Sequence, residues 1–575
     1  MIQTNSIGVL PGLTRKVKDK MRRSQKILCR PEWSINRAYY KSMGYEDSDL
    51  DKPIIGIANA WSTAVPGHYN LRQVADALKE GICGAGGTAV EFGVIGACDG
   101  IAEGHEGMRY ILPTRDVIAD SIELMVQAHQ YDGVVLLGSC DKIVPGMLMA
   151  AARLDLPAIF VNGGPMLGGP IIAGRKADTT SIVEGVGRLQ RGEIEADELA
   201  AMEDLCAPSC GSCSFLGTAN TMCCIAEAMG MSLTGSAMVP ATHSERFRIA
   251  RRSGKAIVRL VKNGLTARRI ITGQSLDNAV RLTSAIGGST NAALHVLAIA
   301  YEAEVDFDID RFDDLSRQTP VIARMNPAAS ANVVDFYRSG GVPAVMSELL
   351  PLLHGEALTV TGRTLAQNLA NASSPDNEVI KTLTHPFSAS GGLAVLRGNL
   401  APDSAVTKPA AIDPSMWKFR GPARVFDSEE RANGAIMAGV VKPGDVVVIR
   451  YEGPKGGPGM PEMFKAMKLL HGLGMAREVA VVTDGRFSGT NNGCFVGHIS
   501  PEAQEGGVIA LVRDNDMIRI DIPAKRLDLE VDDAQLRLRR SVWQPPPPRV
   551  RKGHLYLYSR LAESADKGAI IRNRA

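Results

Sequence analysis

The chain has 575 residues, of which 45% are hydrophobic, 22% charged and 5% aromatic, and its formal net charge is +2. A chain of that length is too long to fold around a single hydrophobic core, so two or more domains are expected. The near-neutral charge gives no reason to expect a nucleic-acid partner, and the apolar runs are too short to predict a membrane span. Close cysteines suit a cytoplasmic protein, although the basic N-terminus leaves a mitochondrial or plastid matrix open.

The first part of the chain alternates β-rich runs with helical patterns. Strands are predicted at 54–58, 90–97, 133–139 and 158–162. Helices are predicted between them at 71–80, 115–129 and 145–153. This order predicts a parallel sheet with right-handed crossovers, and therefore an α/β fold.

The second part is richer in short strands separated by glycine and proline turns. Candidate strands lie at 424–426, 445–450, 478–483, 508–512, 517–522 and 527–531. Their number and spacing predict a compact, barrel-like β domain. Polar, small-residue stretches near 370–376 and 388–392 place the boundary, which gives an N-terminal parallel-sheet α/β domain over 1–384 and a C-terminal β-barrel-like domain over 385–575.

Four cysteines indicate an iron–sulfur site. Cys206, Cys210 and Cys213 lie in CAPSCGSC, and Cys140 lies in GSCDKIVPG. Close thiol spacing without a secretory signal favours cluster ligation over disulfides. A helix predicted to begin near Thr218 would stabilise an anionic cluster through its N-terminal dipole. The same spacing also fits a radical S-adenosylmethionine enzyme, or an electron carrier or sensor without catalysis.

Acidic residues follow the predicted parallel strands at the edge where ligands collect. Asp99 follows the second strand, and Cys140 and Asp141 follow the third. Each acid alone would suit an ordinary surface turn, but together they predict a site for a hard cation such as Mg²⁺. Lys142 could join such a site only if it were carbamylated, since an ammonium group cannot ligate a metal.

Two glycine-rich loops in the second part carry further polar residues. Glu462 lies in YEGPKGGPGMPEM, where it is predicted in the first turn of a helix. Phosphate binding or simple complementation of the helix dipole would each explain it. Ser488 lies in DGRFSGT after a predicted strand, and no histidine–aspartate pair marks it as a hydrolase nucleophile.

Five motifs in order resemble the dihydroxy-acid dehydratase and sugar-acid dehydratase family. They are GSCDKIVPGM, CGSCSFLGTANTM, GGSTN at 287–291, YEGPKGGPGMPEM and DGRFSGTNNGCFVGHISPEA. The likeness runs from about Arg23 to the C-terminus. It implies an N-terminal α/β domain, a C-terminal β-barrel and a homodimer or a dimer of dimers.

The resemblance also implies residue roles. Its cluster cysteines fall on Cys140 and Cys213, and its Mg²⁺ ligands fall on Asp99, Asp141, carbamylated Lys142 and Glu462. Ser488 matches the serine that acts as the base.

One departure concerns a further cluster cysteine of many members, which is Gly67 in this chain. Members with glycine there resemble this chain in having Cys206 and Cys210, so an oxygen-sensitive [4Fe–4S] cluster is favoured over [2Fe–2S]. Either of these two cysteines could be the third ligand.

The resemblance implies a hydro-lyase that removes water from a small dihydroxy acid. The strings YLYSRLAESADKGAII and VGHISPEAQEGG look like those of the branched-chain biosynthetic enzymes. The expected substrates are 2,3-dihydroxy-3-methylbutanoate and 2,3-dihydroxy-3-methylpentanoate, on the route to valine and isoleucine. A sugar acid such as an aldonate is the alternative.

Overall fold

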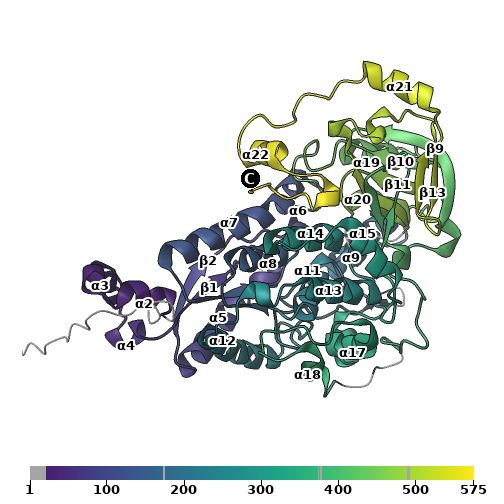
Figure 1. Cartoon of the computed structure of the whole chain (residues 1–575). Coiled ribbons are helices and arrows are strands. Elements are labelled where there is room, and N and C mark those ends of the chain that lie inside the picture. The colour runs from purple at the N-terminus through teal and green to yellow at the C-terminus, as the bar shows by residue number, and fades with distance from the viewer. Residues whose placement is uncertain (1–20, 173–174, 373–374, 376–377, 488–492, 575) are drawn as a thin grey trace, which may run out of the picture.

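The computed structural model describes residues 21–172, 175–372, 375, 378–487 and 493–574. The chain forms a mainly helical N-terminal part and a C-terminal part that contains most of the strands (Figure 1). Two large clusters of buried hydrophobic side chains lie in the described residues, one mainly in the N-terminal part and one in the C-terminal part. Among the described residues, no helix combines the length and apolar character that a membrane crossing requires.

The N-terminal part contains the predicted parallel sheet. Its described strands are β1 (Ile54–Asn59), β2 (Thr88–Gly93), β3 (Gly133–Gly138) and β4 (Ala158–Asn162), in the order β2-β1-β3-β4. Every neighbouring pair is parallel, so the α/β prediction is confirmed. Strands β1, β3 and β4 are buried at each position, because helices cover both faces of such a sheet. The strand predicted over 90–97 ends at Gly93, and the following residues form the loop to Asp99.

Helices cover this sheet and extend beyond it. The helices up to residue 228 are α2 (Arg23–Leu28), α3 (Ser34–Ser42), α4 (Asp47–Leu50), α5 (Leu71–Gly84), α6 (Asp99–Ala102), α7 (Ile111–His129), α8 (Ile143–Leu154), α9 (Thr179–Gln190), α10 (Ala196–Leu205) and α11 (Thr218–Ala228). They continue with α12 (Glu245–Asn263), α13 (Gly273–Ala285), α14 (Asn291–Ala303), α15 (Ile309–Arg317), α16 (Val333–Arg338), α17 (Gly341–Leu349) and α18 (Leu365–Leu369). Helix α11 begins at Thr218 as predicted.

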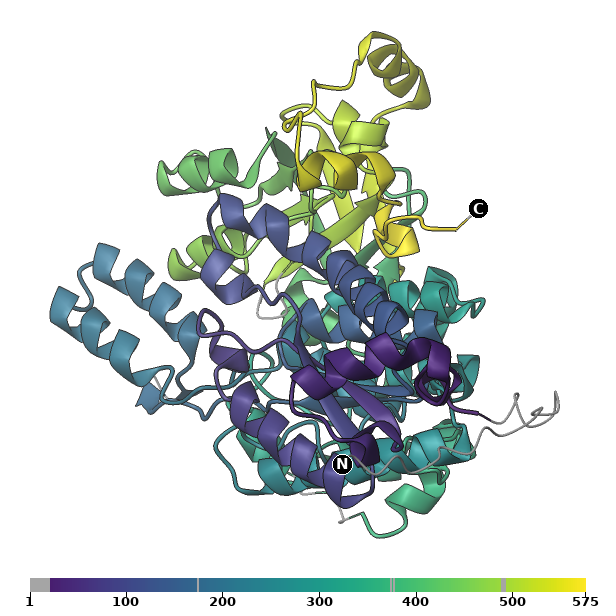
Figure 2. The ribbon, with the colours of Figure 1, turned by 90° about the vertical axis from the view of Figure 1, so that its left-hand side faces the viewer.

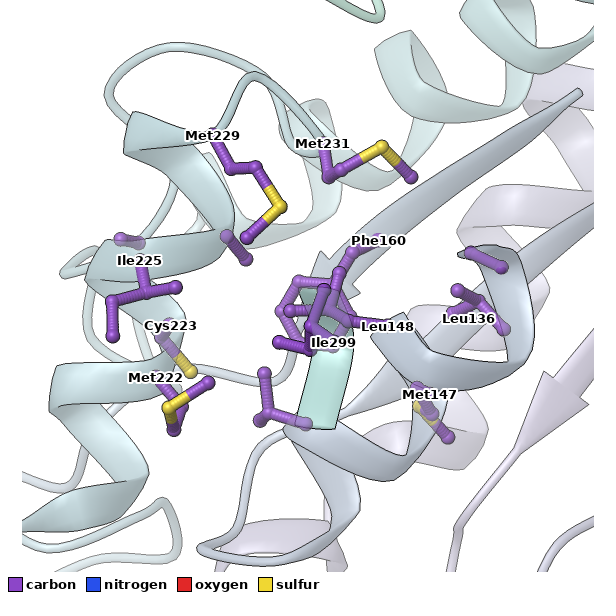
Figure 3. Packing of buried hydrophobic residues seen from close by; sticks show 14 of the residues in the cluster. Leu136, Met147, Leu148, Phe160, Met222, Cys223, Ile225, Met229, Met231 and Ile299 are labelled. Atoms are coloured by element: carbon purple, nitrogen blue, oxygen red, sulfur yellow. The ribbon is translucent and has the colours of Figure 1, made fainter. Parts of the chain in front are cut away.

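The packing between α11, α8 and β4 shows how the core forms (Figure 3). Met222, Cys223 and Ile225 from α11 lie near Leu148 from α8 and Phe160 from β4 (Figure 3). Each of these side chains is almost completely buried. Cys223 therefore serves as a small core residue, since its surroundings are apolar.

The C-terminal part is a mixed sheet that nearly closes into a barrel. Its described strands are β7 (Ala394–Leu396), β8 (Ser404–Thr407), β9 (Lys418–Phe426), β10 (Val446–Ile449), β11 (Ala480–Thr483), β12 (Cys494–Ser500), β13 (Met517–Asp521) and β14 (Arg526–Leu529). Their order is β14-β13-β9-β10-β11-β12-β8-β7. Arg397, next to β7, accepts a hydrogen bond from Leu527 N and donates one to Lys525 O, each at 3.0 Å. These bonds connect the two edges, so the barrel-like prediction is confirmed.

Two details of the predicted C-terminal strands are corrected. Residues 508–512 are apolar but form a 3₁₀ turn, Val508–Leu511, because their side chains pack on the barrel without pairing the backbone. Strands β7, β8 and β12 were not predicted, since they are short or interrupted by glycine and histidine. The helices of this part are α19 (Glu429–Met437), α20 (Lys465–Gly472), α21 (Asp533–Val542) and α22 (His554–Leu561).

A helical hairpin formed by α9 and α10 projects from the N-terminal part (Figure 2). It reaches α20 of the C-terminal part, where Lys468 Nζ lies 3.2 Å from Glu184 Oε1. The hairpin therefore connects the two parts at their junction.

Candidate active site

A cavity of about 430 Å³ lies at the junction of the two parts. The loops that follow the parallel strands form much of its wall, as expected for an open α/β sheet. Its polar and sulfur-bearing lining includes Cys98, Asp99, Glu103, Cys140, Asp141 and Cys213. The predicted residues Asp99, Cys140, Asp141 and Cys213 are thus brought together.

Cys140 is buried two residues after the end of β3, and His68 fixes its loop. The Nε2 atom of His68 accepts hydrogen bonds from the backbone N–H of Ser139 at 3.2 Å and of Cys140 at 3.3 Å. Burial lowers the pKa of His68 to about 4. The ring is therefore neutral near pH 7, which leaves Nε2 free to accept both bonds.

Cys213 lies on a loop that is bonded to the end of β4. Ser212 O accepts from Met166 N at 2.7 Å, and Ser212 N donates to Gly164 O at 3.0 Å. From α11, Asn220 Nδ2 donates to Cys213 O at 2.6 Å. These bonds fix the thiol at the cavity wall.

The other two cysteines of this loop lie elsewhere. Cys206 is buried in a small cluster with Ala177, Ile194 and Met202, and Cys210 is half-buried. Both are described residues, and neither lines the cavity. The sequence resemblance had left either of them open as a third ligand.

A different cysteine, Cys98, lines the same cavity as Cys140 and Cys213. Burial, and then the neighbouring Asp99, raise the pKa of Cys98 to about 11. Burial also raises the pKa of Cys140 and Cys213 well above the usual range, and the nearby Cys98 adds to both shifts. Without a cation the three thiols remain protonated at neutral pH, so thiolate formation requires a metal centre.

Three carboxylates lie together at this site, and two of them, Asp99 and Glu103, line the cavity. Oxygen atoms of Asp99, Glu103 and Glu462 all lie within 4.8 Å of one another. Burial and the charges of Asp99 and Glu462 raise the pKa of Glu103 well above its usual range. Glu103 was not predicted, although its position four residues after Asp99, one helical turn away, was a usable signal.

Lys142 lies between acidic side chains from both parts. It contacts Asp141, and its Nζ atom is 3.3 Å from Glu462 Oε1. Burial, and then the nearby Arg486, lower the pKa of Lys142 to about 7. A substantial neutral fraction of the amine therefore exists at neutral pH, which is the form that reacts with CO₂ to give a carbamate.

Glu462 is fixed by two residues for which the sequence predicted no role. Asn291 Nδ2 donates to Glu462 Oε1 at 2.9 Å, and Arg486 also donates to that oxygen. Arg486 Nη1 in turn donates to Asn291 Oδ1 at 2.8 Å. Glu462 is not in a helical turn as predicted; it pairs with Arg486 in a short parallel bridge, and α20 begins at Lys465. The segment around Glu462, which follows the glycine-rich loop, runs beside Arg486 in an extended conformation, so the helix starts three residues later.

Ser488 lies outside the described residues. The residue before it, Phe487, is buried, and its carbonyl oxygen accepts from Asn291 Nδ2 at 3.2 Å. The chain that leads to Ser488 is therefore attached to the residue that fixes Glu462.

Two family descriptions match almost the whole chain. Residues 52–368 match "Dihydroxy-acid/6-phosphogluconate dehydratase N-terminal", and residues 378–569 match the corresponding C-terminal description. The chain belongs to the dihydroxy-acid/6-phosphogluconate dehydratase family. The resemblance carried by the five motifs is thereby confirmed.

Individual members of the dehydratase family are similar over nearly their full length. A dihydroxy-acid dehydratase of Caldanaerobacter subterraneus subsp. tengcongensis is 49% identical over 543 residues, which cover 94% of this chain and 98% of the relative. The protein of that name from Ignicoccus hospitalis is 49% identical over 553 residues, or 96% of this chain and all (100%) of the relative. The one from Pyrococcus furiosus is 48% identical over 544 residues, or 94% and 98%.

Members of this family generally depend on an iron–sulfur cluster and Mg²⁺. The donors in the cavity fit both groups, because thiols are soft ligands for iron and carboxylates are hard ligands for Mg²⁺. The two donor classes also occupy one cavity, so a single substrate could contact both cofactors.

Proposed function

We propose that this enzyme dehydrates 2,3-dihydroxy-3-methylbutanoate and 2,3-dihydroxy-3-methylpentanoate to the corresponding 2-keto acids. The observation that carries the proposal is that the Cys140 and Cys213 thiols and the Asp99 carboxylate line one cavity, while a carboxylate oxygen of Glu462 lies within 4.8 Å of one of Asp99. Such products precede valine and isoleucine, so the enzyme would act in branched-chain amino-acid biosynthesis.

The cavity residues divide between the two cofactors. Cys140 and Cys213 would bind the iron–sulfur cluster, and Asp99, Asp141, carbamylated Lys142 and Glu462 would bind Mg²⁺. When bound, the cluster supplies a Lewis acid for the 3-hydroxyl group, and Mg²⁺ stabilises the negative charge that develops beside the carboxylate. A [4Fe–4S] cluster is favoured over [2Fe–2S], because this chain resembles the members of the family that have glycine at the position of Gly67.

The chain's own residues would orient the substrate and move the proton. Ser488, as an alkoxide, would remove the proton from carbon 2 while the carbon 3–oxygen bond breaks and hydroxide leaves. The resulting enol tautomerises to the keto acid, so the balance is loss of one water with no net electron transfer. Asn291 and Arg486 support this step by fixing Glu462, and Asn291 also contacts the carbonyl beside Ser488.

The rest of the cavity wall supports the branched-chain substrate class. Met166, Phe215 and Phe464 are buried and line the cavity, together with Ile101 and Val183. Apolar side chains suit the methyl and ethyl groups of the proposed substrates, whereas the extra hydroxyls of a sugar acid would lose hydrogen bonds to water there. The relatives described above are named dihydroxy-acid dehydratases, which agrees with this choice.

The decisive test is a keto-acid assay on anaerobically reconstituted protein with both substrate classes. We expect turnover of the branched dihydroxy acids and little turnover of aldonates; a large preference for aldonates would overturn the substrate assignment. Ser488→Ala should abolish turnover and leave the cluster spectrum intact. Retained activity in that variant would remove the serine from the mechanism.

Assembly and domain division belong to the same proposal. A homodimer or a dimer of dimers is supported by the sequence resemblance, and a cytoplasmic location by the closely spaced cysteines. Division into 1–384 and 385–575 is proposed from the sequence; the two family matches, which end at residue 368 and begin at residue 378, support a division within about ten residues of that boundary. Sedimentation analysis of the reconstituted protein tests the oligomer.

A further inference from the structure

The proposed function assigns two protein ligands to the iron–sulfur cluster and leaves the third unassigned. A [4Fe–4S] or [2Fe–2S] cluster normally has four cysteine ligands, so a cluster with one iron position open to a substrate hydroxyl takes three cysteine thiolates from the protein. Cys140 and Cys213 account for two of them. Gly67 has no side chain, and a Cβ atom placed on it would lie 2.5 Å from Cys140 Sγ. The question is which other thiol of this chain reaches the cavity.

Two Cys-Asp pairs follow the two strands that flank β1. Cys98-Asp99 comes after β2, and Cys140-Asp141 comes after β3 and Ser139. Both strands pair with β1 in parallel, so their carboxyl ends lie at the same edge of the sheet. All four of these residues line the cavity. The topology therefore presents two thiols, each with a carboxylate, from opposite sides of β1.

The remaining cysteines near the site are poorly placed. Cys206 lies in the small apolar cluster beside α9 and α10, and moving it to the cavity would disrupt that packing. Cys210 is half-buried but does not line the cavity. Cys223 is buried in the main core, where its thiol donates to Ser139 O at 3.8 Å. The described cysteines that line the cavity are Cys98, Cys140 and Cys213.

We propose that Cys98 is the third thiolate ligand of the cluster, and that neither Cys206 nor Cys210 is. The inference rests on the proposed function, because it assumes that a cluster binds in this cavity. The loop after β2 would then supply a thiolate to the cluster and, through the adjacent Asp99, a carboxylate to Mg²⁺. Neighbouring residues on one short loop would fix the separation of the two cofactors.

The first experiment compares iron binding among single variants. Cys98→Ser, Cys206→Ser, Cys210→Ser and a control, Cys83→Ser, are reconstituted anaerobically, exposed to a chelator and desalted. Iron and sulfide are then measured with the electron paramagnetic resonance spectrum of the reduced protein. Cys83 is exposed on α5, away from the cavity, so its variant should match the wild type.

The expected result is specific to one position. Cys98→Ser should retain about one tenth of the wild-type iron after exposure to the chelator and show an altered spectrum. Loss of a residue that only supports a metal ligand weakens metal binding by about tenfold or more, and loss of the ligand itself should weaken it at least as much. Cys206→Ser and Cys210→Ser should keep the wild-type iron content and spectrum. The reverse pattern, with iron kept in Cys98→Ser and lost in Cys210→Ser or Cys206→Ser, would overturn the assignment.

A second experiment needs no variant and remains informative if Cys98→Ser fails to fold. The wild-type holoprotein is alkylated, the cluster is removed, and the protein is unfolded and labelled with an isotopically heavier reagent. Cys98, Cys140 and Cys213 should carry the heavy label, whereas in apoprotein alkylated for the same time Cys98 should carry more of the light one, because its side chain is only partly buried. Light label on Cys98 in the holoprotein, with heavy label on Cys140 and Cys213, would contradict the proposal.

These outcomes separate the ligand assignment from the proposed function. If the wild type binds the cluster through Cys98 but converts neither substrate class, the dehydratase proposal fails and the assignment stands. If the wild type is active and Cys98→Ser retains its cluster, the assignment alone fails. If the reconstituted wild type binds no iron, both are overturned.

Discussion

Asn291 Nδ2 lies 2.9 Å from Glu462 Oε1, so the first residue of α14 fixes a carboxylate that comes 171 positions later in the chain. The Oδ1 atom of Asn291 also accepts from the buried Arg486 at 2.8 Å. One amide therefore satisfies an anion and a cation that are both buried. This arrangement makes Asn291 a supporting residue of the site.

Replacing Asn291 with alanine should weaken both the fold and the metal site. Two charge-assisted hydrogen bonds would be lost, and the partners would stay buried, which costs about 2–3 kcal/mol of unfolding free energy. Chemical denaturation measures that change, and calorimetric titration should show weaker Mg²⁺ binding. Asn263→Ala, at the exposed end of α12, is the control and should change neither quantity. An Asn291→Ala protein with unchanged Mg²⁺ affinity would show that Asn291 does not support Glu462.

Glu103 should contribute to Mg²⁺ binding, because its carboxylate oxygen lies within 4.8 Å of those of Asp99 and Glu462. Glu103→Gln should raise the Kd for Mg²⁺ about tenfold, as loss of a nearby carboxylate does at other metal sites. Calorimetric titration of Glu103→Gln and of the wild type with Mg²⁺ measures the change in Kd. Glu106→Gln is a matched control, since Glu106 is three residues further along and exposed to solvent. Equal Mg²⁺ affinity in both variants would exclude Glu103 from the site.

A side chain at position 67 should disturb cluster binding. In Gly67→Ala the new Cβ atom would lie 2.5 Å from Cys140 Sγ, so the thiol must rotate away from its present position. We expect less iron after reconstitution and a loss of about 1–3 kcal/mol in unfolding free energy from overpacking. Gly93→Ala is the control, because a Cβ atom there meets no other atom within 4 Å. Full cluster content in Gly67→Ala would mean that this rotamer of Cys140 is not the ligating one.

Carbamylation of Lys142 should depend on pH in a defined direction. Its pKa is lowered to about 7, so the reactive neutral amine is scarce at pH 6 and dominant at pH 8. At constant pressure of ¹³C-labelled CO₂, the carbamate signal in the NMR spectrum should therefore rise between these values.

The matched control for this experiment is a second buried lysine. Burial also lowers the pKa of Lys408 to about 7, so it tests whether any buried amine gives the signal. Lys142→Met should abolish the carbamate signal, and Lys408→Met should retain it. The opposite result would assign the carbamate to Lys408.

His68 should make the protein sensitive to mild acid. Its folded-state pKa is about 4, below the usual value of 6.5, so the unfolded state takes up the proton first as pH falls. The stability from the neutral ring is complete above pH 6.5 and is lost as pH falls toward 4, by about 3 kcal/mol. Glutamine at this position can accept the same N–H bonds without titrating in this range. Wild type should lose more stability than His68→Gln between pH 7 and 4; equal slopes would contradict this role.

Sequence reasoning located the first sheet and part of the site for a clear physical reason. Strands buried on both faces are continuous apolar runs, and parallel order places their following loops at one edge. Asp99 and Cys140 could therefore be grouped from the sequence alone. The strand that follows Ser488, by contrast, contains glycine and histidine, and its pairing depends on the distant β8.

The residues that were missed act through contacts between distant segments. Asn291 and Arg486 lie inside recognisable motifs, yet their role depends on Glu462 arriving from another loop. Cys98 directly precedes Asp99 in the chain, but no spacing rule connects it to Cys140 and Cys213. A thiol of this kind is identified by the cavity it lines, which local sequence does not encode.

The contact between Lys142 and Glu462 joins two separately packed cores, and this has a consequence for biosynthesis. A nascent polypeptide that has left the ribosome only through α18 already carries Cys98, Cys140 and Cys213 but no Glu462. Its sulfur atoms would face solvent and oxidants without the covering wall that Phe464 provides. We therefore expect the iron–sulfur cluster and Mg²⁺ to bind after translation is complete. A chain truncated after α18 should form disulfide cross-links more readily than the full-length protein.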